Sequence, residues 1–160
     1  MKKIIVAIII LATVLACGTT KTVRASQKVI KGNWMLSNIT YSDYGTFKIT
    51  FFNDVSKGCF EGSNWQFIPN NNRGTYTISG DNCSKGDRNF IFTIQEIDEA
   101  TGLYDFLLKP TDAKFKSEDN KGFRLKLVVL TDDNMQWTQT ATVDGKTINI
   151  NMNFSKNIEQ

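Results

Sequence analysis

Short segments in which apolar and polar residues alternate make up most of the chain beyond its N-terminal region. In the most regular of them, Ile148, Ile150, Met152 and Phe154 are separated by single polar residues. Successive side chains of a β-strand point to opposite faces, so this pattern predicts strands with one apolar and one polar face. The apolar positions of the other predicted strands are Phe47, Ile49 and Phe51; Trp65 and Phe67; Tyr76 and Ile78; Phe90, Phe92 and Ile94; Tyr104, Phe106 and Leu108; Phe123, Leu125, Leu127 and Val129; and Met135 and Trp137.

Residues that favour tight turns separate these segments. The pair Asp144-Gly145 is typical of a two-residue β-hairpin loop, and Asn-Asn-Asn-Arg-Gly at 70–74 predicts another turn. We therefore expect about eight strands and no amphipathic helix. An open sheet of this length would expose two edges, whereas a closed barrel exposes none. The predicted fold class is all-β, an up-and-down antiparallel β-barrel of about eight strands. A sandwich of two sheets is the alternative.

The first residues predict an export signal rather than part of the folded domain, so residues 1–16 are assigned to a signal peptide. Lys2 and Lys3 precede an apolar stretch of thirteen residues, 4–16, whereas a membrane-spanning helix needs about twenty. The stretch ends in Val14-Leu15-Ala16-Cys17, which resembles the lipobox of bacterial lipoproteins. This resemblance implies cleavage before Cys17 and acylation of its thiol. An ordinary secretory signal followed by an unmodified cysteine is the alternative.

Residues 17–28 are expected to be the lipidated cysteine and a flexible tether, because 18–28 are polar and show no period. The folded domain then spans residues 29–160. Gly18 follows Cys17 in place of an aspartate. By resemblance to lipoprotein sorting signals, this residue implies anchoring to the outer membrane, with the domain facing the periplasm. The membrane is thus an expected partner, reached through the N-terminal lipid.

The sequence contains three cysteines. If Cys17 carries lipid, Cys59 and Cys83 remain as a pair in an oxidising compartment. Their midpoint, position 71, lies within the turn predicted at 70–74. Positions paired across an antiparallel hairpin have a nearly constant sum, so these two cysteines fall opposite each other. We therefore predict a Cys59–Cys83 disulfide, and two free thiols are the alternative.

Charge and composition exclude several functional classes. Removing Lys2 and Lys3 from the 19 basic residues leaves 17 against 16 acidic ones, which gives no large field to attract nucleic acid. The chain has no histidine, so histidine-dependent triads and zinc sites are absent. No nucleotide-binding glycine motif occurs either. We predict no catalytic residue, metal or cofactor, and no enzyme activity. The carboxylates expected to be solvated turn residues are Glu61, Asp81, Asp87, Glu96, Asp98, Glu99, Glu118, Asp119, Asp132 and Asp133.

The segment Gly32-Asn33-Trp34, which enters the first predicted strand and precedes a run of hairpins, resembles the opening signature of the lipocalins. Over residues 29–156 the chain is similar to lipocalin-like domain lipoproteins of Gram-negative bacteria of the Bacteroidetes type. The resemblance implies that Trp34 plugs the closed end of a barrel beneath a basic side chain, here Lys156 where the family usually has arginine. Trp34 as an ordinary core residue is the alternative.

Many aromatic residues fall on the predicted inner faces of the strands. The lipocalin resemblance implies an apolar pocket and the binding or transport of a small hydrophobic ligand in the cell envelope. Alternatively, the rings fill the barrel and the domain is a protein–protein interaction module, an accessory protein or an inhibitor. The residues predicted to bind ligand are Phe47, Phe51, Trp65, Tyr76, Phe92, Tyr104, Phe106 and Trp137.

Overall fold

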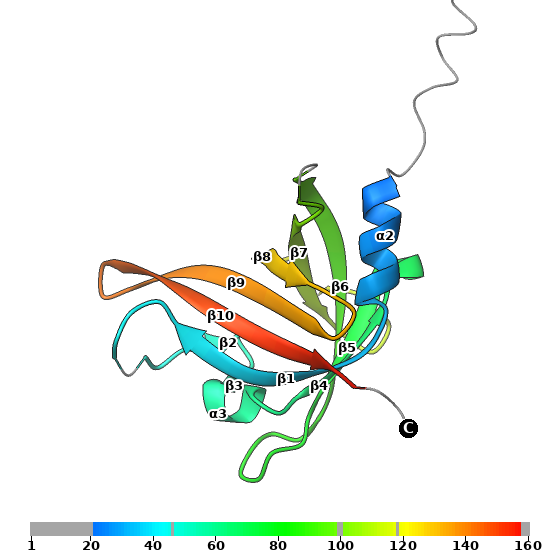
Figure 1. Cartoon of the computed structure of the whole chain (residues 1–160). Coiled ribbons are helices and arrows are strands. Elements are labelled where there is room, and N and C mark those ends of the chain that lie inside the picture. The colour runs from blue at the N-terminus through cyan, green and yellow to red at the C-terminus, as the bar shows by residue number, and fades with distance from the viewer. Residues whose placement is uncertain (1–20, 46, 99–100, 118, 158–160) are drawn as a thin grey trace, which may run out of the picture.

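Eight antiparallel strands form one closed barrel (Figure 1). The computed structural model describes residues 21–45, 47–98, 101–117 and 119–157. Each barrel strand pairs with its neighbour in the chain, and β1 closes the cylinder by pairing with both β4 and β10. This topology confirms the up-and-down barrel and rules out the two-sheet sandwich. The strands are β1 (Gly32–Tyr41), β4 (Asn64–Ile68), β5 (Arg73–Ile78), β6 (Gly86–Ile97), β7 (Tyr104–Thr111), β8 (Phe123–Leu130), β9 (Asn134–Val143) and β10 (Lys146–Lys156).

The period-two pattern correctly predicted which strand face is buried. In β10, the four apolar residues that alternate from Ile148 to Phe154 are all at most 2% exposed. The residues between them face outward, and each binds its cross-strand partner on β9: Asn151 Oδ1 accepts from Thr138 Oγ1 at 2.8 Å, for example. An apolar interior and a polar, hydrogen-bonded exterior therefore hold the register of this pair.

The strand predicted around residues 46–52 is wrong. Of its described residues, only Thr50–Phe51 (β2) forms a strand, and this strand pairs with Val55–Ser56 (β3) in a separate two-stranded ribbon in the long connection between β1 and β4. The short helix α3 (Lys57–Phe60) follows directly. The alternation in this region has a different cause, because the apolar residues of the connection cover one end of the barrel. Phe51 and Phe60 are both buried there.

The predicted flexible tether is also wrong for its described part, because residues 21–30 form the helix α2 (Lys21–Ile30). An isolated helix of this length is marginal in water, and contacts with the barrel support it. Trp34 Nε1 donates to the carbonyl of Ile30 at 2.9 Å, and Lys156 Nζ donates to that of Val29 at 2.9 Å. Barrel side chains thus satisfy carbonyls that a helix end leaves unpaired. Within the described residues, no helix is long and apolar enough to cross a membrane. The predicted signal peptide and Cys17 lie outside the described residues.

The hairpin of β4 and β5 and the disulfide beyond it are confirmed. Asn64 pairs with Thr77 and Trp65 with Tyr76 around a turn that contains the 3-10 helix η2 (Pro69–Asn71). Cys59 and Cys83 form a disulfide with their Cα atoms 5.6 Å apart. The disulfide links α3 to the connection between β5 and β6. The symmetric positions of the two cysteines about residue 71 correctly predicted that they pair.

Trp34 and Lys156 lie together at the end of the barrel covered by α2. The two residues are directly paired across β1 and β10. The Trp34 side chain is fully buried, and Lys156 Nζ lies 4.9 Å from the centroid of its ring. This is within the range of a cation–π contact. We call this end of the cylinder the closed end and the opposite end, next to β2, β3 and α3, the mouth.

Candidate functional site

The aromatic residues predicted to line a ligand pocket pack against one another instead. The Trp65 ring stacks on Tyr76 at a centroid distance of 4.5 Å and meets the edge of Trp137 at 5.2 Å. Phe106 contacts Trp137 at 5.0 Å. Seven of the eight are at most 3% exposed, and Phe47 is half-buried outside this group. Space is so limited that a Cβ added at Gly74 would overlap the Phe90 ring. The rings therefore fill the space that they were predicted to enclose.

One polar atom in the middle of these rings, Trp137 Nε1, has no hydrogen-bond partner among the described residues. A buried donor without a partner costs about 1–3 kcal/mol, and most buried polar groups avoid that cost. The interior of the barrel therefore contains an N–H donor, on Trp137, that no described residue of the protein accepts.

The mouth is covered by the segment Thr50–Phe60, which we call the mouth segment. A tight turn joins its two short strands, with Asp54 N donating to the Phe51 carbonyl at 2.9 Å. Both central residues of the turn have positive φ, 50° at Phe52 and 58° at Asn53. Such turns favour asparagine, aspartate or glycine, and a left-handed conformation costs a residue with a Cβ about 1–2 kcal/mol. Phe52 is thus held in a strained conformation.

Burial of its side chain offsets the strain at Phe52. The ring is 4% exposed and contacts Phe123 at a centroid distance of 5.0 Å and Phe60 at 5.4 Å. It also reaches Trp65 at 6.1 Å, so it inserts from outside toward the aromatic interior. Burying a phenylalanine side chain is worth about 1.5–3 kcal/mol. Phe52 therefore closes the mouth. Because the free energy gained by burial and the cost of the backbone strain nearly cancel, this placement stabilises the folded protein only slightly.

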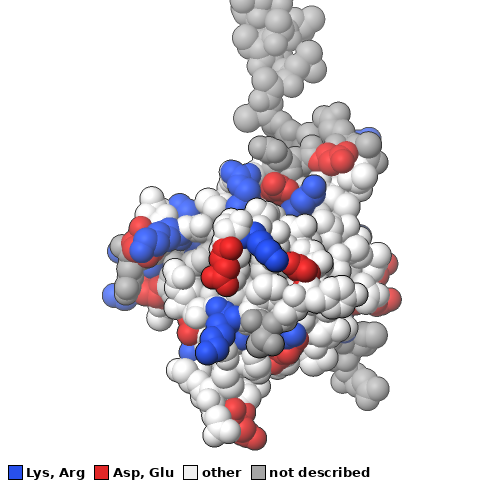
Figure 2. All heavy atoms as spheres, turned by 90° about the vertical axis from the view of Figure 1, so that its left-hand side faces the viewer, with Lys and Arg blue, Asp and Glu red and all other residues white. Residues whose placement is uncertain are grey.

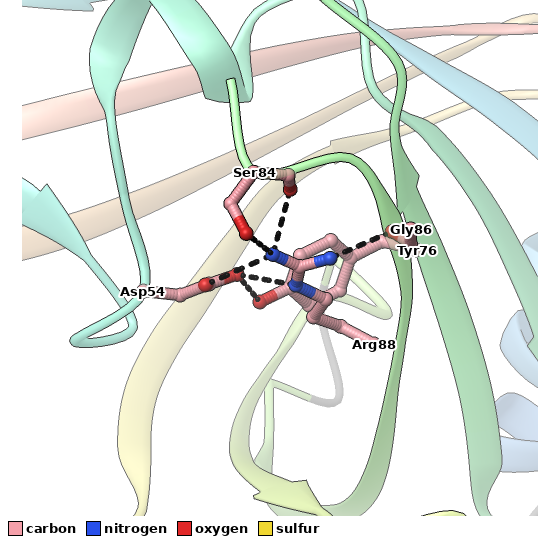
Figure 3. Close-up of polar contacts among 5 residues, drawn as sticks. All are labelled: Asp54, Tyr76, Ser84, Gly86 and Arg88. Atoms are coloured by element: carbon pink, nitrogen blue, oxygen red, sulfur yellow. Dashed lines mark hydrogen bonds and ion pairs between the residues drawn. The ribbon is translucent and has the colours of Figure 1, made fainter.

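Three polar residues fasten the mouth segment to the barrel, and we call them the mouth clamp: Asp54, Tyr76 and Arg88 (Figure 3). The Asp54 carboxylate accepts from Tyr76 Oη and from Arg88 Nε, each at 3.0 Å. Arg88 also donates to the backbone carbonyls of Ser84 and Gly86 at 2.8 and 2.9 Å. The Asp54 and Arg88 side chains are 25% and 21% exposed, so solvent weakens this ion pair only in part.

Tyr76 and Tyr104 are expected to make the protein less stable at alkaline pH. Burial raises the pKa of both phenols above the usual value of 10.0, and the Asp54 carboxylate adds to the effect at Tyr76. The stability that these groups contribute is complete below about pH 10 and is lost above it, because the unfolded chain releases protons that the folded chain retains. Each tyrosine then lowers the free energy of unfolding by about 1.4 kcal/mol per pH unit.

Urea denaturation at a series of pH values between about 9 and about 12 measures this slope. Tyr76→Phe and Tyr104→Phe each remove one of the two phenols. In each variant the free energy of unfolding should therefore fall less steeply with pH, by about 1.4 kcal/mol per pH unit. A variant with the same slope as the wild type would show that its tyrosine does not contribute.

An open cleft of about 350 Å³ lies beside the mouth segment. Phe52, Pro110 and Phe123 form its apolar part, and Asp119 and Lys121 stand at its rim in an ion pair of 3.2 Å. The backbone N–H of Lys121 holds the pKa of Asp119 below its usual range. Removing the Phe52 ring would extend this cleft toward the interior of the barrel.

A second open cleft, of about 510 Å³, lies toward the closed end between β7 and β8. The pairing of these strands ends at Asp105 and Lys126, so β8 continues without a partner on that side. Tyr104 and Leu127 contribute to its lining. Tyr104 is the one predicted ligand-binding residue that lines either of the two clefts described here.

The prediction that the loop carboxylates are solvated turn residues is correct for only some of them. Asp119 is exposed, but Glu61 is not simply a solvated turn residue. Glu61 Oε1 accepts from the backbone N–H of Ile39 at 2.7 Å and lies 3.5 Å from Lys57 Nζ, so it links α3 to β1. Among the residues that the structure describes, no group of three or more acidic or cysteine side chains could hold a metal ion. The Glu96, Glu99 and Glu118 side chains lie outside the described residues.

The sequence pattern did not predict a role for Phe52, Asp54 or Arg88. Phe52 continued an apolar run and showed no feature that separated it from a strand residue. Asp54 and Arg88 are 34 positions apart and belong to a turn and a strand, so their contact follows only from the fold. The turn-forming pair Asn53-Asp54 was the one available signal that the chain reverses directly after Phe52.

Comparison with known proteins finds similarity in structure but not in sequence. The sequence matches no family model, and it matches no curated protein sequence. The structure is similar to the crystal structure of a lipocalin-like protein from Bacteroides uniformis, with a TM-score of 0.49 and 9% sequence identity. The similarity covers 81% of this chain and 99% of that chain. The closed strand order described above, rather than this likeness, establishes the barrel.

Proposed function

We propose that this protein is a lipid-anchored binding protein of the cell envelope that takes up a small apolar ligand at the barrel mouth, with Phe52 as the displaceable closure. The observation that carries the proposal is the strained turn that places the Phe52 ring in the mouth. Strained backbone is typical of sites where a segment serves function rather than stability. A ring held at little net gain can leave the mouth at small cost.

The surroundings of Phe52 define the chemistry of the ligand. Phe123 and Pro110 offer an apolar surface beside it, and the adjoining cleft of about 350 Å³ is within the size range of small-molecule sites. Farther inside, Trp137 Nε1 is a hydrogen-bond donor without a partner among the described residues. A mainly apolar molecule with one hydrogen-bond acceptor, such as a fatty acid or its ester, fits these features.

Anchoring belongs to the same proposal and is supported by the sequence alone. Residues 1–16 and the Val14-Leu15-Ala16-Cys17 motif predict a lipoprotein signal, and Gly18 predicts the outer membrane with the domain on its periplasmic face. Labelling of cells with a radioactive or clickable fatty acid tests the anchor directly. The label should appear on the wild-type protein and be absent from the Cys17→Ser variant.

Replacing Phe52 tests the binding site. Phe52→Gly removes the ring, and glycine adopts positive φ without strain, so the turn should persist while the mouth opens. We expect the affinity for a dansyl-labelled undecanoic acid to rise about tenfold or more, because the ligand no longer has to displace the ring. Fluorescence titration of the purified protein measures the affinity, and urea denaturation shows that the variant remains folded.

Tyr44→Ala is the matched control, because it removes an aromatic ring from the same connection at a fully exposed position. It should leave the affinity unchanged. Phe123→Ala should lower the affinity of the Phe52→Gly protein, since it removes the facing wall. If neither the wild type nor the Phe52→Gly variant binds the probe, the ligand proposal is wrong.

The packed interior favours a second candidate function, a protein–protein interaction module. Rings such as Trp65 and Trp137 already occupy the centre of the barrel, so loops at the mouth would contact a protein partner without any ligand. Photo-cross-linking from Asn53 in intact cells tests this role. A discrete cross-linked product that the Phe52→Gly change leaves unaltered would support it, and no product would contradict it.

A further inference from the structure

Four basic side chains form a stripe along helix α2 and directly after it. Lys21, Arg24, Lys28 and Lys31 are spaced by three, four and three positions, which places them on one side of a helix of 3.6 residues per turn. All four are exposed. We call them the basic stripe.

The opposite side of α2 is fastened to the closed end of the barrel. Ser26 is 8% exposed and Ile30 is 1% exposed. Ser26 Oγ donates to the Gly102 carbonyl at 3.2 Å, and the Ile30 carbonyl accepts from Trp34. These contacts set the rotation of the helix about its axis. The basic stripe therefore points away from the barrel and cannot turn inward without breaking them.

The stripe is also free of acidic residues in its own part of the chain. No aspartate or glutamate precedes Asp43 in the sequence, so the four stripe residues are the only charged residues between positions 18 and 42. The surface in Figure 2, seen from the side where the β9–β10 hairpin projects in Figure 1, instead shows acidic and basic residues interspersed. Within residues 18–42 the charge is therefore of one sign, and the described acidic residues at this end of the barrel, such as Asp98 and Asp133, belong to the β6–β7 and β8–β9 turns.

The position of the stripe in the chain indicates its partner. Lys21 follows Cys17 by only four residues, which can span at most about 14 Å even when fully extended. We propose that the basic stripe binds the anionic headgroups of the membrane surface and lays α2 against it. The inference goes beyond the proposed ligand site and uses the proposed anchor only to argue proximity. Each lysine or arginine close to a surface of anionic lipids adds about 1 kcal/mol to membrane binding.

This contact orients the barrel. Helix α2 covers the closed end, next to Trp34 and Lys156, while the mouth segment lies at the other end of the cylinder (Figure 1). With the stripe on the headgroups, the closed end is directed to the membrane and Phe52 is directed into the aqueous space. The mouth then remains accessible to a soluble donor or acceptor of ligand.

Vesicle binding without the lipid tests the stripe independently of acylation and of ligand. The mature chain, residues 17–160 with Cys17→Ser, contains the complete barrel and α2. It should sediment with vesicles that contain phosphatidylglycerol and not with vesicles of phosphatidylcholine alone, and added salt should release it. Lys21→Gln, Arg24→Gln and Lys28→Gln together should weaken this binding about 100-fold, at about fivefold for each side chain.

A variant with the same change in net charge is the control: Lys114→Gln, Lys116→Gln and Lys146→Gln, three exposed lysines at the mouth end. It should bind the phosphatidylglycerol vesicles almost as tightly as the parent. Equal loss in both triple variants would show that net charge alone governs binding and would overturn the assignment. The absence of binding by the parent would also overturn it, as would tighter binding to soluble polyglutamate, which would assign the stripe to an acidic protein.

Discussion

Trp34→Ala is expected to lower the free energy of unfolding by about 4 kcal/mol, within the range of buried tryptophan truncations. The indole is fully buried where β1 pairs with both β4 and β10, so the change leaves a cavity at the point where the barrel closes. It also leaves the Ile30 carbonyl without its Nε1–H donor and removes the ring beneath Lys156. Urea denaturation followed by circular dichroism measures the loss.

Two further variants separate the contributions. Met35→Ala changes the adjacent residue, which is 38% exposed on the outer face of β1, and should cost less than about 1 kcal/mol. A double-mutant cycle of Trp34→Leu with Lys156→Met should give a coupling of about 0.5–2 kcal/mol if the cation–π contact contributes. A Trp34→Ala protein within about 1 kcal/mol of the wild type would contradict a structural role for the indole.

Loss of the Cys59–Cys83 disulfide is expected to destabilise the protein by about 3 kcal/mol. The bridge joins residues 24 positions apart, and in the chain-entropy model a closed loop of this size restricts the unfolded state by about that amount. In the folded protein it also keeps α3 beside the β5–β6 connection. The comparison is between the wild type and Cys59→Ala with Cys83→Ala, both in a Cys17→Ser background that removes the third thiol.

Reduction of the disulfide supplies the control. A reductant should shift the urea midpoint of the parent toward that of the double variant and should leave the double variant unchanged. Hydrogen exchange should show the largest increase in the mouth segment, because α3 loses its covalent tie there. If the disulfide-bonded parent and the double variant unfold at the same urea concentration, the expected stabilisation is contradicted.

The two ends of the barrel differ in how they are held together. At the closed end, Trp34 and Lys156 are strand residues, and their contacts follow from the register of β1 and β10. At the mouth, the segment around Phe52 lies outside the barrel sheet, and an ion pair to Arg88 of β6 and the disulfide hold it there. The proposed function requires only the Phe52 ring, which is placed by a strained turn, to leave the mouth while these contacts persist.

The strand pattern was readable from the sequence because burial in a barrel repeats every second residue. Ile148, Met152 and their neighbours in β10 are buried as the alternation predicted. The symmetric placement of Cys59 and Cys83 about the turn likewise depends only on local hairpin geometry. Both features arise between residues that are adjacent in the chain or in one hairpin, so a single sequence contains the information.

The mouth and helix α2 were decided by the tertiary structure. The alternation of Phe47, Ile49 and Phe51 is that of a strand, yet the barrel already closes through β4 and β1, so these residues cover its end instead. Helix α2 is too short to be stable alone and depends on donors from Trp34 and Lys156. The eight aromatic side chains were correctly placed on inner faces in most cases, but whether such rings enclose a space or fill it depends on how they pack across the barrel. A periodic pattern records the direction of a side chain, whereas the distance between two side chains from remote strands is set only when the barrel closes.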